Sequence, residues 1–139
     1  MRVLIFADRL GRELQPLAER SCVALLPVVG KPVLEHALER LVAAGLRRAS
    51  IAISPQAENM RSTFGDGSRW GMRLDYVLTR GEAEPDDILA AQPRLTDEVL
   101  ALRGDVLHGA NVSAFLQAAG EVAGPVVYGG TAGEPVSYC

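Results

Sequence analysis

Residues 1–46 read MRVLIFADRLGRELQPLAERSCVALLPVVGKPVLEHALERLVAAGL, and the class of fold can be predicted from them. Its short apolar segment Arg2–Ala7 predicts a strand that is buried on both faces of a parallel sheet. The break at Asp8–Gly11 predicts a loop at the carboxyl end of that strand, where ligands bind in open α/β sheets. A helix is expected from Pro32 to Gly45, because proline suits the first helical position, leucines recur at helical spacing and glycine can end a helix.

The rest of the chain repeats this alternation of strand and helix. Strands are predicted at residues 49–54, 70–78, 99–102 and 124–128, and helices at residues 55–64, 86–91 and 111–119. The alternating pattern of residues 70–78 is typical of a strand near the edge of a sheet. Asn111 is a suitable N-cap for the last helix. The sequence therefore predicts an α/β fold with a mostly parallel sheet of about five strands.

Length and composition narrow the class of protein. A chain of 139 residues can bury about two thirds of its unfolded surface, which is enough for one domain. The net charge of -3 and the lack of a cluster of Lys and Arg with interleaved aromatic residues argue against nucleic-acid binding. No apolar run reaches the length of a membrane span, and the N-terminus does not resemble a signal peptide, so a cytoplasmic protein is expected. The two cysteines have no metal-ligand spacing.

Three separated stretches carry a family resemblance. They are LLPVVGKPVLEHALERLVAAG at residues 25–45, GDGSRWGMRLDYVL at residues 65–78, and the Gly104-Asp105 pair behind the apolar run VLAL. With these segments in this order, the chain resembles the sugar-1-phosphate nucleotidylyltransferases, the NDP-sugar pyrophosphorylases.

That resemblance implies a Rossmann-like three-layer sandwich of the nucleotidyltransferase or glycosyltransferase-A type. It implies a single nucleotidyltransferase-like domain over residues 1–139, which is incomplete relative to the family. Full-length family members continue into a sugar-contacting half and a second metal-binding aspartate. We therefore expect the C-terminal part of the fold to be truncated.

The chain departs from the family in the loop after the first strand. Family members carry A-G-G-x-G-T-R-L-x-P there, whereas residues 7–16 of this chain read ADRLGRELQP. Asp8 and Arg9 thus replace a pair of glycines at a place where the backbone of the family must approach a nucleotide. By the same resemblance, a nucleotide-binding loop, if the chain has one, comprises Ala7, Asp8, Gly11 and Arg12.

The positions of the family's two catalytic cations have also changed. The resemblance assigns them to Glu13 and Val23, and neither residue carries a positive charge. Nucleotidyl transfer depends on positioning and on neutralisation of the phosphates by cations and magnesium. Loss of one preorganised donor costs roughly 3–4 kcal/mol of transition-state stabilisation, and this chain lacks two.

We therefore expect no catalytic residues and interpret the chain as a catalytically inactive, nucleotidyltransferase-like domain. Its expected role is in binding or assembly near sugar-nucleotide or polysaccharide metabolism. The alternative is a divergent or truncated sugar-1-phosphate nucleotidylyltransferase, which converts a nucleoside triphosphate and a sugar-1-phosphate to an NDP-sugar and pyrophosphate. A nucleotide or sugar-phosphate is the expected small-molecule partner if the loop binds one.

Asp105 is the candidate metal ligand, because the resemblance places it where the family holds magnesium. Mg²⁺ is accordingly the expected cofactor if the chain is active, and none is expected otherwise. The competing structural interpretation is that a strand-end aspartate caps a turn. A homo-oligomer or a protein partner is also expected around residues 126–128, because an incomplete sheet exposes strand edges and apolar faces.

Overall fold

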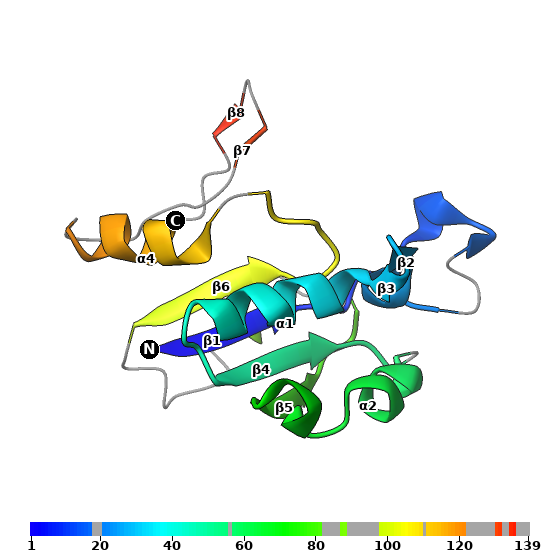
Figure 1. Cartoon of the computed structure of the whole chain (residues 1–139). Helices are drawn as coiled ribbons and strands as arrows, with labels where there is room; N and C mark the ends of the chain where they lie inside the picture. The colour runs from blue at the N-terminus through cyan, green and yellow to red at the C-terminus, as the bar shows by residue number, and fades with distance from the viewer. Residues whose placement is uncertain are drawn as a thin grey trace. The chain divides into compact units, whose positions relative to one another are not determined.

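Figure 1 shows the computed structural model of the chain. The structure describes residues 1–17, 21–55, 57–81, 87–88, 98–109, 111–121, 130–131 and 134–135. Two compact units are present, at residues 1–107 and 108–139. Among the described residues, no helix has the length and apolar character that crossing a membrane requires. The single domain expected over residues 1–139 stays a prediction.

The first unit is built on a parallel sheet of four strands. They are β1 (Arg2–Phe6), β4 (Arg48–Ile53), β5 (Arg73–Leu78) and β6 (Val99–Arg103). Their order is β5-β4-β1-β6, and each neighbouring pair is parallel (Figure 1). Four predicted strands are thus confirmed, with β5 at an edge of the sheet as expected, although β5 begins three residues later than predicted because Trp70 belongs to the preceding turn. The fifth, predicted at residues 124–128, lies outside the described residues.

Helix α1 (Val33–Ala43) covers one face of this sheet. Its side chains Leu34, Leu38 and Leu41 are fully buried. Ile5 of β1 points towards α1, because a Cβ atom on Gly104 would lie 2.7 Å from Ile5 Cγ2 and 3.0 Å from Leu34 Cδ1. The crossover from β1 to β4 therefore packs as the spacing of its leucines predicts.

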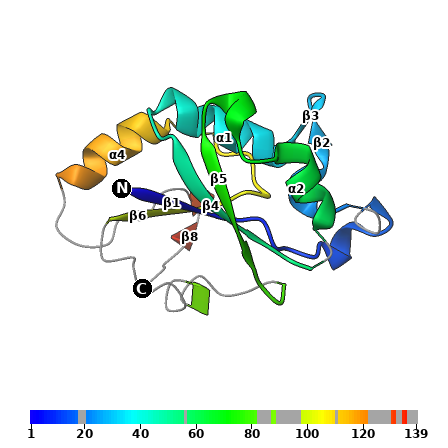
Figure 2. The same ribbon diagram turned by 90° about the horizontal axis from the view of Figure 1, so that it is seen from below.

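The opposite face of the sheet has its own apolar layer. Leu4 and Phe6 alternate with Ile5 along β1, so their side chains point away from α1. They belong to a buried cluster with Ala52 and Ile88. Residues 87–88 are helical and lie across the strands from α1 (Figure 2). This is the three-layer, Rossmann-like arrangement that was predicted, although only residues 87–88 of the helix expected at 86–91 are described.

A second helix connects β4 to β5. Helix α2 (Glu58–Phe64) begins three residues later than the predicted start at residue 55 and is followed by the 3-10 turn η4 (Ser68–Trp70). Gly67 at the start of η4 has a φ of +88°, and a Cβ atom there would lie 2.6 Å from Leu74 Cγ. The GDGS turn therefore requires glycine both for its backbone conformation and for close packing on β5.

A two-residue hairpin precedes α1. Strands β2 (Pro27–Val28) and β3 (Lys31–Pro32) are antiparallel, and Pro27 pairs with Pro32. The predicted helix start at Pro32 is therefore wrong by one residue, because the extended backbone of Pro32 belongs to the hairpin and the helix begins at Val33. His36 on α1 holds the hairpin in place through a hydrogen bond of 2.9 Å between Nε2 and the carbonyl oxygen of Val28.

The tip of this hairpin has an unfavourable backbone conformation. Val29 has a φ of +52° and Gly30 has a φ of +77°, the signs that a type I′ turn requires. Positive φ is costly for a β-branched residue, whereas asparagine tolerates it. The Val29 side chain is 91% exposed, so burial does not offset this cost.

We expect Val29→Asn to raise the free energy of unfolding by about 1 kcal/mol, because Asn-Gly is the preferred pair in this turn. Urea unfolding followed by circular dichroism measures the change. Val106→Asn is the matched control, since it makes the same replacement at an exposed valine whose φ is not positive. An equal effect of both variants would contradict the assignment of strain to the turn.

The second unit contains α4 (Val112–Gly120) and a short antiparallel pair, β7 (Gly130–Thr131) with β8 (Glu134–Pro135). Asn111 caps the helix as predicted, because its Oδ1 accepts hydrogen bonds from the backbone N–H groups of Ser113 at 2.9 Å and Ala114 at 3.3 Å. This strand pair was not among the elements predicted from the sequence.

Candidate functional site

The candidate site is the loop that follows β1, at the carboxyl ends of the strands. The Ala7 N–H donates to the Ala52 carbonyl at 2.9 Å, and the Gly104 N–H donates to the Phe6 carbonyl at 2.8 Å. Parallel pairing therefore holds the start of the loop on both sides. The loop then turns at Gly11, whose φ is +65°, into the 3-10 turn η1 (Arg12–Leu14).

Asp8 ties the loop to the end of β5. Its side chain is turned into the protein, and the residue is only 4% exposed. The hydroxyl group of Thr79 donates to Asp8 Oδ2 at 2.7 Å, and the Gly81 N–H donates to Thr79 Oγ1 at 3.0 Å. The Asp8 carboxylate thus forms part of an internal contact between two strand ends.

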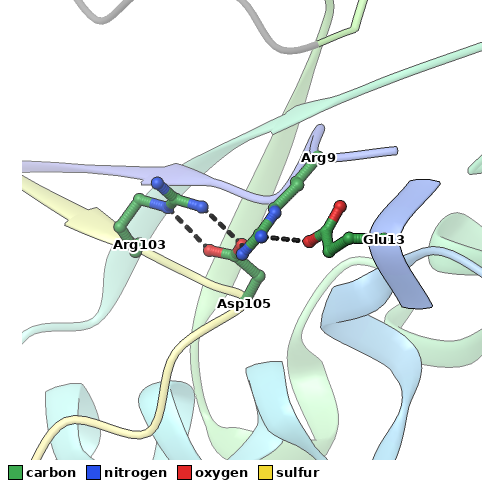
Figure 3. A network of polar contacts seen from close by, with 4 residues as sticks. All are labelled: Arg9, Glu13, Arg103 and Asp105. Carbon is green, nitrogen blue, oxygen red and sulfur yellow. Dashed lines mark hydrogen bonds and ion pairs between the residues drawn. The ribbon is translucent and has the colours of Figure 1, made fainter. Parts of the chain in front are cut away.

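Arg9 ties the same loop to the end of β6. Its guanidinium group lies between Glu13 and Asp105, with Nη1 3.4 Å from Asp105 Oδ2 and Nη2 donating to Glu13 Oε1 (Figure 3). Arg103 approaches Asp105 from the last position of β6, with Nε 2.7 Å from Oδ1 and Nη2 2.5 Å from Oδ2. We call these four residues the strand-end ion network.

Asp105 is the buried centre of this network. Its side chain is 1% exposed, whereas the side chains of Arg9 and Arg103 are 39% and 45% exposed. Burial raises the pKa of Asp105, but the hydrogen bonds and the charge of Arg103, with a hydrogen bond from Arg9, outweigh burial and hold this pKa below its ordinary value. The carboxylate is therefore stabilised in its charged form by guanidinium groups from two separate chain segments.

We expect Asp105→Asn to lower the free energy of unfolding by about 2–3 kcal/mol at neutral pH, because charge-assisted hydrogen bonds to a buried carboxylate are lost. The folded pKa is lower than the unfolded one, so the stabilisation is complete above about pH 4 and declines as the pH falls through the folded value. Urea unfolding across the acid range should show the difference between wild type and variant shrinking below about pH 4.

Asp75→Asn is the matched control for this prediction. Asp75 also faces two arginines, Arg48 at 3.7 Å and Arg73 at 3.8 Å, but its side chain is 46% exposed. An exposed pair contributes at most about 1 kcal/mol, so this variant should change stability little at any pH. If Asp105→Asn cost no more than Asp75→Asn, the buried network would not contribute as described.

The two positions assigned to the family's catalytic cations lie in different surroundings. Glu13 lies in η1, its side chain is 50% exposed, and it forms the ion pair with Arg9. Val23 lies in the 3-10 turn η3 (Val23–Leu25), is buried and has no part in the strand-end ion network. Neither position supplies a positive charge.

The remaining residues of the predicted nucleotide-binding loop surround these contacts. Ala7 and Gly11 are buried, and Arg12 is exposed on η1. The structure thus brings Asp105 together with Arg9 and Glu13 and places Asp8 on the β5 side of the loop. Whether the loop binds a nucleotide stays a prediction.

Sequence reasoning missed two residues that organise the site. Arg103 pairs with Asp105, two positions further along the chain. Residues at this spacing lie on the same face of an extended segment, so the pair could have been predicted from the sequence. Thr79, which joins Asp8 to β5, follows directly after the predicted strand. Its contact spans 71 positions of the chain, and no local pattern indicates it.

Comparison with known proteins identifies the family. The sequence model of the family described as Nucleotidyl transferase matches residues 3–137. The chain belongs to this nucleotidyl transferase family. It is 32% identical over 146 residues to a glucose-1-phosphate thymidylyltransferase of Actinoplanes sp., covering 99% of this chain and 47% of that protein. It is 32% identical over 108 residues to a mannose-1-phosphate guanylyltransferase of Mycobacterium tuberculosis, covering 76% of this chain and 30% of that protein.

Solved structures confirm the nucleotidyl transferase fold. One is the crystal structure of a Bacillus anthracis protein, described as a candidate glucose-1-phosphate thymidylyltransferase, in complex with sucrose. It superposes with a TM-score of 0.78 at 18% identity, over 87% of this chain and 50% of that one. A CTP:phosphocholine cytidylyltransferase of Streptococcus pneumoniae superposes with a TM-score of 0.65 at 22% identity. The superposition covers 80% of this chain and 47% of that one. The chain spans less than half the length of the two curated relatives named above.

Magnesium, which the family resemblance implies, can be tested against the residues around Asp105. Both carboxylate oxygens of Asp105 accept hydrogen bonds from guanidinium groups. In the part of the chain that the structure describes, no three His, Cys, Asp or Glu side chains gather as a metal site. The donor set at this strand end fits arginine and does not fit a divalent cation.

Proposed function

We propose that this chain is a catalytically inactive nucleotidyl transferase domain, a pseudoenzyme with a binding or assembly role near sugar-nucleotide or polysaccharide metabolism in the cytoplasm. The observation that carries the proposal is the loop after β1. Asp8 and Arg9, which replace the glycine pair, both bind other parts of the same chain. Their side chains fasten the loop to β5 and β6, where a catalytic loop would need free backbone for a nucleotide.

The charges around this loop support the same proposal. Transfer of a nucleotidyl group requires positive charge that stabilises the transition state more than the ground state. Glu13 and Val23 provide none, and Arg9 is engaged by Glu13 and Asp105. The strand-end ion network contains two guanidinium groups and two carboxylates, so its formal charge is balanced. Little positive potential then remains for a triphosphate.

The second candidate is a divergent or truncated sugar-1-phosphate nucleotidylyltransferase. Its support is the match over 99% of this chain to a protein named as a glucose-1-phosphate thymidylyltransferase, together with the limited share of that protein that the chain covers. In this case the substrates would be a nucleoside triphosphate and a sugar-1-phosphate. Mg²⁺ would then have to be bound at Asp105 with help from the substrate phosphates.

We expect no pyrophosphate release above a protein-free control when the chain is incubated with Mg²⁺, each nucleoside triphosphate and glucose-1-phosphate or mannose-1-phosphate. The reason is the lack of both cations, each of which is expected to contribute roughly 3–4 kcal/mol to transition-state stabilisation. A coupled colorimetric assay for pyrophosphate measures the product. Release that disappears in Asp105→Ala would overturn the proposal and favour the second candidate.

A rebuilt loop provides a matched comparison for this assay. The variant Glu13→Arg/Val23→Lys restores both positive charges while leaving the fastening residues Asp8 and Arg9 in place. Pyrophosphate release by this variant alone would identify the two lost cations as the cause of inactivity and would contradict a role for Asp8 and Arg9 in it. Circular dichroism must show that the lysine at the buried position 23 leaves the fold intact.

The proposed role includes self-association or a protein partner. Several large apolar side chains of the first unit are exposed, with Leu17 at 68%, Val29 at 91% and Leu78 at 63%. Such residues contribute to association when they are covered by another surface. The predicted contact at residues 126–128 lies outside the described residues.

We expect sedimentation velocity to show concentration-dependent association of the purified chain, because covering exposed apolar side chains is favourable. The measurement should extend from micromolar to near-millimolar protein. A single monomeric species throughout, with no partner recovered by pull-down, would count against a role in assembly. Repeating the series at high salt separates apolar contacts from electrostatic ones, since salt weakens only the latter.

A further inference from the structure

We propose that the guanidinium groups of Arg9 and Arg103 take the place of a divalent cation at Asp105, so that this strand end is a closed, metal-independent site. The inference rests on the geometry of the strand-end ion network and does not depend on the proposed function. It concerns what Asp105 binds, whether or not the chain transfers a nucleotidyl group.

The first argument is the occupancy of the carboxylate. Two ionised oxygens offer about four lone-pair sites in all. Arg103 forms a two-pronged contact, with Nε 2.7 Å from Oδ1 and Nη2 2.5 Å from Oδ2, and Arg9 Nη1 lies 3.4 Å from Oδ2 (Figure 3). A Mg²⁺ ion requires oxygen ligands at about 2.0–2.1 Å in octahedral geometry. The three contacts take three of the four sites, including both on Oδ2, so an ion bound by both oxygens could reach Asp105 only after displacing at least one of these guanidinium groups.

The charges around Asp105 also disfavour a divalent cation. Two positive side chains already face the one negative charge of Asp105, and Glu13 balances the remaining positive charge on the outer side of Arg9. A divalent cation at Asp105 would therefore repel two neighbours at close range. Because the Asp105 side chain is 1% exposed, water screens that repulsion poorly.

The third argument is that the arrangement is built into the backbone. Gly104 joins Arg103 to Asp105, and its N–H donates to the Phe6 carbonyl at 2.8 Å. A Cβ atom at this position would lie 2.7 Å from Ile5 Cγ2, so this linking residue is fixed closely against β1. Arg9 arrives from the other side, in the loop after β1. The two guanidinium groups thus converge on Asp105 from neighbouring strands whose pairing sets their separation.

Binding of Mn²⁺, an EPR-active substitute for Mg²⁺, tests the inference directly. Titration of the wild-type chain with Mn²⁺, followed by the loss of the free-ion EPR signal, should show no bound ion at Asp105 up to millimolar concentration. The double variant Arg9→Gln/Arg103→Gln should bind Mn²⁺ at least about tenfold more tightly than the wild type does, because the carboxylate is then released from its internal cations. Adding Asp105→Asn to this variant should abolish the gain.

Arg48→Gln/Arg73→Gln is the matched control. It removes two arginines from Asp75, whose side chain is 46% exposed on β5 at the opposite edge of the sheet, and so makes the same change in net charge. It should not gain a comparable site. Mn²⁺ binding by the wild type that Asp105→Asn abolishes would overturn the inference, as would a folded Arg9→Gln/Arg103→Gln variant that gains no site.

The Tm of the wild type tests the same inference without a double variant. We expect the same Tm in EDTA, in Mg²⁺ and in Mn²⁺, because a ligand that binds only the folded state would raise it. A metal-dependent rise that Asp105→Asn removes would overturn the inference. Metal binding at Asp105 without pyrophosphate release would overturn this inference alone, whereas release that survives Asp105→Asn would overturn the proposed function alone.

Discussion

The buried carboxylate of Asp105 imposes the constraint on which this end of the molecule depends. A charge whose side chain is 1% exposed is tolerated only when it is paired and hydrogen-bonded. Arg103 satisfies this requirement from the last position of β6, two residues before Asp105, and Arg9 satisfies it from the loop after β1. The position of that loop is therefore coupled to the need to neutralise one acidic group.

The loop is held from two opposite sides by neighbouring residues. Asp8 reaches Thr79, which follows β5, and Arg9 reaches Asp105, which follows β6. Two substitutions that remove backbone freedom from the loop thus also supply the side chains that fasten it. Both side chains are thus directed at other parts of the protein, which favours one fixed conformation of the loop.

Apolar runs and glycine positions were enough to predict the strands of the sheet, the crossover helix and the capped helix at Asn111, because these follow from local periodicity. The start of α1 could not be placed to the residue, since Pro32 suits both a helix and the hairpin that it joins. Burial of Asp8 could not be predicted, because its partner Thr79 is 71 positions away. The pairing of Arg103 with Asp105 could have been predicted from their spacing of two residues. Prediction of the pairing of Arg9 with Asp105 would have required the order of the strands in the sheet.

The order of the strands also determines when the sheet can be completed during synthesis. The central strand β1 is made first, but one of its two neighbours, β6, is made only after residue 98, and Arg9 meets Asp105 across 96 positions. At translation rates of about 5–20 residues per second, one edge of β1 stays unpaired for roughly 5–20 seconds. Arg9 lacks its partner Asp105 for the same interval, so the loop after β1 can be fastened on the β6 side only once that strand has been made.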